Sequence, residues 1–297
     1  MVARRRMKSL STGTHLRRQM GQSLEFRDYR HWVPGDDVRH VDWVISSRQG
    51  GRPGLDRLLV KRFATEDRLR MVVVIDSRDT MRLPAAMPKL RHAGWLAEAL
   101  ARLAGAERDQ CFLTAPWAGG MTPLEIRQTS GAGQITPWLA RLWDAPDQQR
   151  ANLTTTFNML GPAALLVIIS DLYGQDDSND MTRLIARGRA GNAEMFLVDL
   201  DSWPHERAIL TDRAHAIDGP GLFNRVELDL NEQRVKLVEQ RITDHKADLL
   251  SGIPPGSISR SRWTWEESAQ LGDAGAHFRR CFSDDPVLRR LFSREAL

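Results

Sequence analysis

Apolar runs alternate with helix-like stripes of apolar residues through the middle of the chain. Met71 to Ile75 is a continuous apolar run rich in β-branched side chains, which predicts a strand covered on both faces. Residues 87–104 carry apolar side chains at helical spacing, with Pro88 in the first turn, and predict a helix. We therefore expect a strand followed by a crossover helix.

The same alternation continues further along the chain. The apolar pattern predicts strands at 110–115, 165–170 and 194–200, and helices at 133–143 and 179–187. Strands that alternate with helices are typical of α/β proteins, in which crossover connections place helices on the faces of one sheet. We therefore predict an α/β fold with a doubly wound, mainly parallel sheet.

The segments before and after this alternation have different patterns. Residues 22–63 mix extended stretches with Gly and Pro turns, which predicts a small irregular β layer rather than helices. Residues 205–230 predict additional edge strands. These patterns divide the chain into three parts, namely a basic N-terminal β appendage at 1–68, a sheet domain at 69–230 and a C-terminal helical extension at 231–297.

The C-terminal part is predicted to be mainly helical. Asn231 can cap a helix that runs to about Leu250, because a side-chain oxygen at this position satisfies a free backbone N–H. Trp263 and Trp265 alternate around a threonine, as in a strand or a buried anchor. The expected buried face of the first helix holds Val235, Val238 and Ile242. Further helical patterns lie at 266–281 and 286–292.

The composition is that of an ordinary globular protein. The chain has 297 residues, of which 41% are hydrophobic and 27% charged. Its longest apolar run, 163–169, is far shorter than the roughly 20 residues of a spanning helix, so we expect a cytoplasmic protein with no membrane anchor. Cys111 and Cys281 have no neighbouring Cys or His at metal-ligand spacing, which predicts two free thiols.

The net charge of +4 is unevenly distributed. Residues 1–70 hold 16 Lys and Arg against 8 Asp and Glu, whereas the remainder holds 26 against 30. A basic start with Arg4, Arg5, Arg6 and Lys8 can bind phosphates through counterion release, which indicates nucleic acid or an anionic membrane surface as classes of partner. The other interpretation is that the arginines of this part pair with its own aspartates.

A polar motif, RHWVPGDDVRHVDWVISSR, spans residues 30–48. Pro34 and Gly35 suit the central positions of a type II turn, and Trp32 and Trp43 are expected to be apolar anchors. The charged residues are close enough for several ion pairs, which favours a scaffold, while a direct contact surface remains the alternative. The residues of this candidate motif are Arg30, Asp36, Asp37, Arg39, Asp42, Trp43 and Arg48.

This motif, followed by Leu59-Val60-Lys61-Arg62-Phe63 and an apolar strand that ends in Asp76, resembles the bacterial family called domain of unknown function 58 (DUF58). The resemblance covers residues 10–100 well and the remainder loosely. The chain differs from the usual family pattern at Trp32, where the family has Tyr, and at Ser47, where it has Ala. The family's central domain resembles a von Willebrand factor A (VWA) domain, which implies a VWA-like doubly wound sheet.

The resemblance also implies a metal-ion-dependent adhesion site at the strand ends. Such a site reads Asp-x-Ser-x-Ser, with a Thr from a second loop and an Asp from a later strand, and holds Mg²⁺ with hard oxygens. In this chain Asp76, Thr80 and Asp171 match three of the ligands, and Arg78 replaces the first serine. The second-loop threonine is left open among Thr154, Thr155 and Thr156.

Arg78 leaves two interpretations of this site, one without a metal and one with Mg²⁺. A guanidinium repels a divalent cation and can pair with Asp76 or Asp171 instead, so we expect no cofactor, with Mg²⁺ as the alternative. The strand-end loops would then recognise an acidic or carboxylate-bearing surface, through a bound metal or through Arg78 itself.

Enzymatic alternatives are less well supported by the motifs. The order Asp76-x-Arg78-x-Thr80 echoes that of haloacid-dehalogenase phosphatases, but Arg78 stands where their general acid is needed. The glycine pair Gly131 and Gly133 does not continue into a nucleotide-binding fingerprint, and the chain contains no nucleophile-elbow or P-loop motif. We therefore predict that the protein is not an enzyme and has no catalytic residues, and a metal-dependent hydrolase is the least favoured alternative.

The resemblance implies a function in partnership with an ATPase. Members of the family often accompany MoxR-type AAA+ ATPases and are thought to act in the maturation or remodelling of other proteins. We therefore expect a protein-interaction module that serves as an adaptor of such an ATPase, with other VWA-like proteins as further candidate partners. The alternative is a nucleic-acid-associated module that uses the basic N-terminal region.

Overall fold

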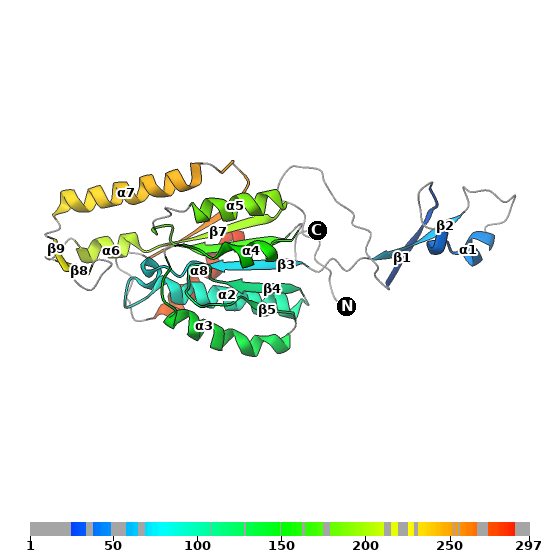
Figure 1. Cartoon of the computed structure of the whole chain (residues 1–297), viewed down its shortest axis with the longest axis horizontal. Helices are drawn as coiled ribbons and strands as arrows, with labels where there is room; N and C mark the ends of the chain where they lie inside the picture. The colour runs from blue at the N-terminus through cyan, green and yellow to red at the C-terminus, as the bar shows by residue number, and fades with distance from the viewer. Residues whose placement is uncertain are drawn as a thin grey trace. The chain divides into compact units, whose positions relative to one another are not determined.

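Figure 1 shows the computed structural model of the chain. The chain divides into two compact units, a small one within Thr12–Arg68 and a large one that holds Leu69–Leu297. The boundary between 68 and 69 is also the point at which the sequence pattern changes. The structure describes residues 25–33, 38–48, 58–64, 69–107, 109–127, 129–148, 150–161, 164–174, 179–210, 215–218, 225–228, 231–251, 253–254, 256–265 and 273–288.

The large unit is built on a six-stranded sheet with the order β10-β7-β6-β3-β4-β5. Neighbouring strands are parallel except for the short edge strand β5, which is antiparallel to β4. This strand order confirms the predicted doubly wound and mainly parallel sheet. The strands are β3 (Arg70–Ile75), β4 (Gln110–Thr114), β5 (Leu124–Ile126), β6 (Leu165–Ser170), β7 (Glu194–Asp201) and β10 (Ser259–Thr264).

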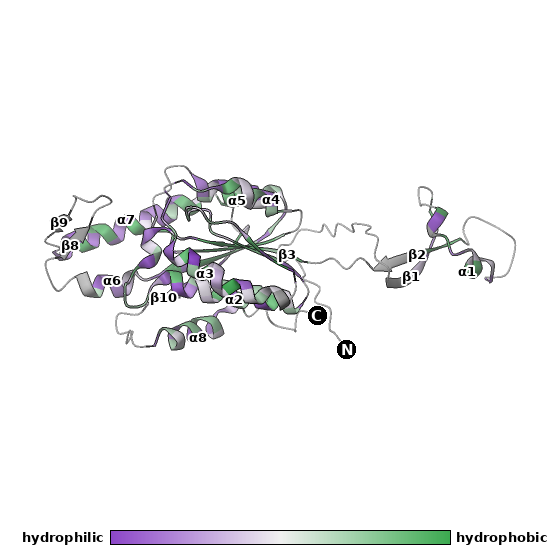
Figure 2. Cartoon of the chain, turned by 60° about the horizontal axis from the view of Figure 1, so that its bottom comes forward, coloured by the Kyte–Doolittle hydropathy of each residue, from purple (hydrophilic) through white to green (hydrophobic). Residues whose placement is uncertain are grey.

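Helices cover both faces of this sheet. The described helices of the large unit are α2 (Lys89–Ala106), α3 (Ile135–Asp144), α4 (Leu153–Met159), α5 (Asp180–Ala190), α6 (Trp203–Leu210), α7 (Glu232–Ser251) and α8 (Ala274–Asp284). In Figure 2, α4 and α5 lie above the sheet and α2 and α8 lie below it.

The central strand β3 explains why two layers of helices are needed. Val73 and Ile75 pack in a core with residues of α2, α3 and α8. Val72 and Val74 point to the opposite face and pack with residues of α4 and α5. Because successive side chains of a strand alternate between faces, a run that is apolar throughout must be covered twice.

The C-terminal part differs from the predicted helical extension. β10 pairs in parallel with β7 and completes the sheet, so the division at 231 was wrong. The segment 205–230 also differs, because it begins within α6, and β8 (His215–Asp218) and β9 (Arg225–Leu228) form a separate antiparallel pair. They are not edge strands of the main sheet.

α7 begins where the sequence predicts and is less buried than predicted. The carboxamide oxygen of Asn231 accepts a hydrogen bond from the backbone N–H of Arg234 at 3.0 Å, as a helix cap does. Val235 is buried, but Val238 is 38% exposed, so the prediction of one buried face was wrong at Val238. Figure 2 shows hydrophobic and hydrophilic residues interspersed along α7.

The small unit combines a two-stranded sheet with a short helix. β1 (Glu25–His31) pairs antiparallel with β2 (Leu59–Ala64). α1 (Trp43–Arg48) follows a 3-10 turn at Val38–His40. The β layer is therefore present, while the expectation that this segment lacks helices was wrong. The turns predicted at 34–35, 50–51 and 53–54 lie outside the described residues.

No helix within the described part of the chain is long and apolar enough to cross a membrane. Cys111 and Cys281 are free thiols. Burial raises the pKa of the Cys111 thiol to about 12 and that of Cys281 to about 11, so both thiols are protonated at neutral pH.

A pair of histidines fastens α8 to α2. Nε2 of His92 and Nδ1 of His277 lie 3.1 Å apart, and both rings pack against Trp265 with centroids 4.8 Å away. The other nitrogen of His277 lies 3.2 Å from the carbonyl oxygen of Thr264. Burial and, to a smaller extent, the nearby His277 lower the pKa of His92 to about 4.

This histidine predicts acid sensitivity of the large unit. His92 is neutral when folded and gains a proton on unfolding between pH 6.5 and about 4, so the free energy of unfolding falls as the pH falls through this window. Between pH 7 and pH 5 we expect His92 to account for about 2 kcal/mol of the loss. Urea denaturation of the unmodified chain and of His92→Gln at several pH values measures this difference.

The exposed His31 provides the matched control. His31→Gln should leave the pH dependence of stability as it is in the unmodified chain. If His92→Gln loses as much stability on acidification as the unmodified chain, His92 is not the residue responsible.

Candidate functional site

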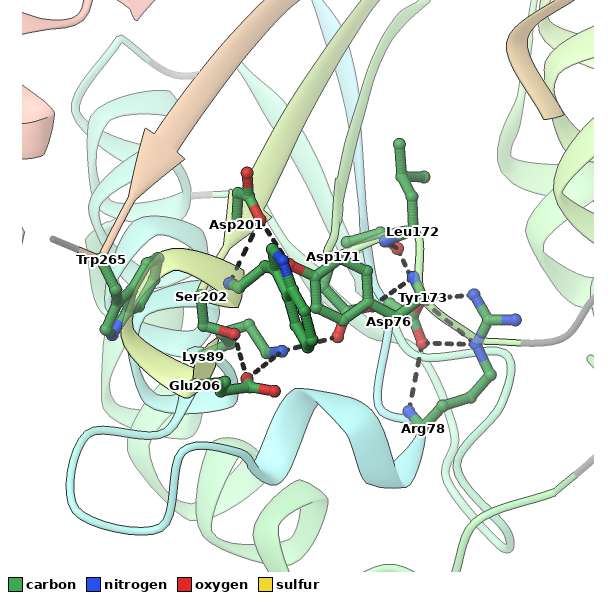
Figure 3. Close-up of polar contacts among 12 residues, drawn as sticks. Asp76, Arg78, Lys89, Asp171, Leu172, Tyr173, Asp201, Ser202, Glu206 and Trp265 are labelled. Carbon is green, nitrogen blue, oxygen red and sulfur yellow. Dashed lines mark hydrogen bonds and ion pairs between the residues drawn. The ribbon is translucent and has the colours of Figure 1, made fainter. Parts of the chain in front are cut away.

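Three neighbouring strands end in aspartates at the same edge of the sheet. Asp76 follows β3, Asp171 follows β6 and Asp201 is the last residue of β7. All three are buried, and Figure 3 shows them grouped with their polar partners. The carboxyl ends of parallel strands are where open α/β sheets place their binding sites. The sequence analysis identified the first two aspartates and missed Asp201.

Asp76 is held by Arg78. Nε of Arg78 donates to the carboxylate at 3.0 Å and Nη2 donates to it at 2.6 Å, while the Ser170 hydroxyl donates to the same carboxylate at 2.6 Å. Burial opposes ionisation of Asp76, but the charge of Arg78 and the hydrogen bonds outweigh it and keep the pKa of the carboxyl below its ordinary value. Asp76 is therefore a fully engaged carboxylate.

The surroundings of Arg78 fix its position. Its guanidinium lies over the ring of Trp117, 4.9 Å from the centroid. A Cβ added to Gly174 would lie 2.4 Å from both Cζ and Nε of Arg78, so the guanidinium fills the space in front of this glycine. Arg78 is 5% exposed. The expectation that Arg78 itself contacts a partner's carboxylate was therefore wrong for this arrangement.

Asp171 has a different cation, Lys89 from the first turn of α2. Nζ of Lys89 lies 3.0 Å from Oδ2 of Asp171 and 3.4 Å from Oε1 of Glu206. The ammonium also lies 4.4 Å from the ring centroid of Tyr173. The sequence analysis missed Lys89. The available signal was a lysine directly after Pro88, beside the buried stripe of a predicted helix.

Tyr173 connects the second carboxylate to the third. Its hydroxyl donates a hydrogen bond to Asp201 and accepts one from the backbone N–H of Trp203 at 3.0 Å. Burial, reinforced by the charge of Asp201, raises the pKa of the phenol. A second ammonium, that of Lys246 in α7, lies 4.6 Å from the ring centroid. The ring of Tyr173 thus contacts lysines of α2 and α7.

Asp201 and Asp199 complete the network along β7. Nε of Arg262 donates to Asp201 at 2.8 Å. Burial opposes ionisation of Asp201, but the charge of Lys246 and the hydrogen bonds that it accepts lower its pKa. Asp199 pairs with Lys246 at 2.8 Å and with Arg260 at 2.5 Å. The arginines come from β10, the adjacent strand.

The charges of this network balance. The carboxylates are Asp76, Asp171, Asp199, Asp201 and Glu206, and the cations paired with them are Arg78, Lys89, Lys246, Arg260 and Arg262. Each acidic side chain therefore has a basic partner from the chain itself. A divalent cation would add two uncompensated positive charges to this edge of the sheet.

The predicted metal ligands accordingly do not fit a metal ion as they are arranged. Asp76 is engaged by Arg78, and Asp171 has Lys89 beside it. The hydroxyl of Thr80 is buried without a hydrogen-bond partner among the described residues. No group of three or more His, Cys, Asp or Glu side chains suited to a metal occurs in the described part of the chain.

The three candidate threonines all lie in α4. Thr154 and Thr155 are exposed, and Thr156 is buried. The hydroxyl of Thr156 lies 3.1 Å from that of Thr114 at the end of β4. Thr156 is thus the member of the run that faces the strand ends, and its hydroxyl is hydrogen-bonded to a neighbouring strand.

The motif of the small unit is partly described. The Asp42 carboxylate accepts hydrogen bonds from the Tyr29 hydroxyl at 3.0 Å and from the backbone N–H of Ile45 at 3.1 Å, so it caps α1. Trp43, which the sequence predicts to be an apolar anchor, is 60% exposed. The exposed Arg39 and Arg48 also belong to this unit.

The same motif also includes Arg30, Asp36 and Asp37. Nη1 of Arg30 donates to the carbonyl oxygen of His31 at 3.1 Å. Asp36 and Asp37 lie outside the described residues, as does the basic start at residues 4–8. The predicted ion pairs with these aspartates therefore stay predictions.

Removing Arg78 should be costly for stability. Arg78→Met leaves the buried Asp76 carboxylate without its charged partner, and breaking such a pair costs about 3–5 kcal/mol. Urea denaturation at neutral pH measures the loss. The matched control is Arg102→Met, because Arg102 is 55% exposed and pairs with Glu98; the control should lose less than about 0.5 kcal/mol. Equal losses in the two variants would contradict the assignment.

Gly174 provides a second, independent test of the same contact. Gly174→Ala forces the guanidinium of Arg78 away from Asp76 and should cost about 1–3 kcal/mol of unfolding free energy. The cost should shrink when Arg78 is already Met, because the clashing atoms are then absent. Gly133→Ala serves as the control, since a Cβ at Gly133 meets nothing within 4 Å. An undiminished cost in the Met background would show that the clash does not involve Arg78.

Solved structures of other proteins are similar to this chain. No curated protein matches the sequence. The conserved hypothetical protein BatB from Bacteroides thetaiotaomicron is 12% identical, and the alignment covers 72% of this chain and 99% of BatB with a TM-score of 0.38. The SpRpn10 VWA domain is also 12% identical, and its alignment covers 73% of this chain and 95% of the domain with a TM-score of 0.36.

A family model described as "Protein of unknown function DUF58" matches residues 28–236. The matched region includes the motif around Asp42 and Trp43 and the strand ends with Asp76, Asp171 and Asp201. More than half of the chain is thus matched, and the resemblance noted in the sequence is confirmed: the protein belongs to the DUF58 family.

Proposed function

We propose that this protein is a non-enzymatic protein-interaction module that serves as a cytoplasmic adaptor of a MoxR-type AAA+ ATPase in the maturation or remodelling of other proteins. Membership of the DUF58 family supports the ATPase as the partner, through the association that the family resemblance implies. Other VWA-like proteins are further candidate members of the same assembly.

The strand-end network supports a non-enzymatic role. A general base must accept a proton, and a nucleophile must be free to attack. At this edge the buried carboxylates are committed to basic partners, and the Tyr173 hydroxyl donates to Asp201. The Ser202 hydroxyl donates to Glu206 in the same way. These groups form ion pairs and hydrogen bonds with one another, which favours a structural role over proton transfer.

The observation that carries the interaction proposal is the exposure of large apolar side chains on the small unit. Trp43 is 60% exposed, Val44 61% and Val38 56%. The first two begin helix α1, whose start is fixed by the Asp42 cap. Exposed tryptophans are frequent anchors of protein interfaces, because a large rigid ring buries much area at little entropic cost. We assign Trp43 as the principal contact residue.

Binding of the purified chain to a purified MoxR-type AAA+ ATPase tests this proposal. Trp43→Ala should weaken binding about tenfold or more, as expected for the loss of an interface anchor. Biolayer interferometry with the ATPase immobilised gives the affinity. The matched control is Trp143→Ala, which removes a tryptophan that is 39% exposed on the large unit and should leave the affinity unchanged.

Nucleic-acid binding by the same purified chain distinguishes the alternative function from the adaptor proposal. A nucleic-acid-associated module would bind DNA or RNA with an affinity that falls steeply as the salt concentration rises, and deletion of residues 1–10 would reduce it. We expect no such binding. Binding of nucleic acid together with failure to bind the ATPase would replace the adaptor proposal by this alternative.

A further inference from the structure

The strand ends of this protein combine metal-type ligands with side-chain cations. Asp76, Thr80 and Asp171 correspond to ligands of the adhesion site that the family resemblance implies. Nη2 of Arg78 lies 2.6 Å from Oδ2 of Asp76, and Nζ of Lys89 lies 3.0 Å from Oδ2 of Asp171. We infer that Arg78 and Lys89 together hold the place of a divalent cation, so that the site is complete without metal.

The charges agree with this substitution. One guanidinium and one ammonium supply the two positive charges of a divalent ion, and each pairs with a different aspartate of the site. The side chains of Asp76, Lys89 and Asp171 are fully buried, and that of Arg78 is 6% exposed. Pairs this deeply buried are weakly screened by salt, so they persist under conditions that would weaken surface pairs.

Both cations are held in position by other parts of the fold. Arg78 is confined between the ring of Trp117 and the backbone at Gly174. Lys89 is held by Glu206 of α6 and by the ring of Tyr173. The charges are therefore built into the folded chain. They cannot be removed by a chelator, as a bound ion can.

Two buried hydroxyls that lack hydrogen-bond partners in the described part of the chain support the view that this site resembles a metal centre. The hydroxyls of Ser77 and Thr80 are buried and have no hydrogen-bond partner among the described residues. Buried hydroxyls normally find a partner. Thr80 stands at the second hydroxyl position of the adhesion motif, and replacing Arg78 by Ser would restore the first. The remaining oxygen donors are those that Mg²⁺ and Mn²⁺ prefer.

This replacement of a metal ion has a consequence for docking, and the consequence rests on the proposed function. Any docking that uses the strand-end face is independent of metal. The substitution of the cation itself is a property of the isolated chain. Ion binding by the isolated chain can therefore be measured whether or not an ATPase binds.

Thermal melting in EDTA, in Mg²⁺ and in Mn²⁺ provides the test. The unmodified chain should melt at the same temperature in all three. Arg78→Ser should melt lower in EDTA and regain about 5 °C or more in millimolar Mg²⁺ or Mn²⁺, because the ion replaces the lost charge. The double variant Arg78→Ser/Lys89→Met, which also frees Asp171, should respond more strongly than the single variant.

Two controls define the site. Asp76→Asn/Arg78→Ser should lose the response to the ions, because the principal carboxylate is gone. Arg102→Ser removes an exposed arginine that pairs with Glu98 and should give no response to either ion. If Arg78→Ser does not fold in EDTA, refolding in Mn²⁺ should restore a cooperative melt, while Arg78→Lys should fold without any ion.

Three results would overturn the inference. The first is stabilisation of the unmodified chain by Mg²⁺ that disappears in Asp76→Asn. The second is a double variant that melts cooperatively yet responds to neither ion. The third is an Arg78→Ser chain that stays unfolded in both ions although Arg78→Lys folds.

Discussion

The large unit depends on electrical neutrality at the carboxyl edge of its sheet. Three neighbouring strands, β3, β6 and β7, end in buried aspartates, and an isolated carboxylate in such a place is too costly to remain charged. Each is compensated by a guanidinium or ammonium of the same chain. The apolar strands fix where the aspartates lie, and the need to neutralise them then fixes where several distant basic side chains must go.

These pairs also join segments that are far apart in the sequence. Lys89 links α2 to the end of β6, and Lys246 links α7 to β7. The ring of Tyr173 lies within 5 Å of both ammonium groups, so one aromatic side chain is in contact with helices of both layers. The two apolar cores lie on opposite faces of the sheet and hold their helices against it separately. The polar network complements them, because it connects helices of the two layers to each other at the edge of the sheet.

The sequence predicted the parts of this arrangement that depend on local pattern. The buried strands around Val73 and Ile169 were found because apolar β-branched runs are continuous, and Arg78 was suspected because it is two residues from Asp76. Lys89 and Lys246 were missed, because a pairing across the fold leaves no local spacing to detect. β10 was not predicted as a strand of the main sheet because four of the six residues in its segment, SRSRWT, are Ser or Arg. Polar and charged side chains of this kind are common on an edge strand that is paired on one side. Val238 followed the helical pattern and is nevertheless exposed.

The position of β10 after α7 in the order of the chain has a consequence for biosynthesis. The strand emerges from the ribosome after α7, and with it come Arg260 and Arg262, the partners of Asp199 and Asp201. A nascent chain that ends before β10 has β7 as an open edge and carries two acidic side chains whose arginines have not yet been made. The cover of this edge and the two arginines arrive in the same six residues, so the sheet can complete its fold only after residues 259–264 have been synthesised.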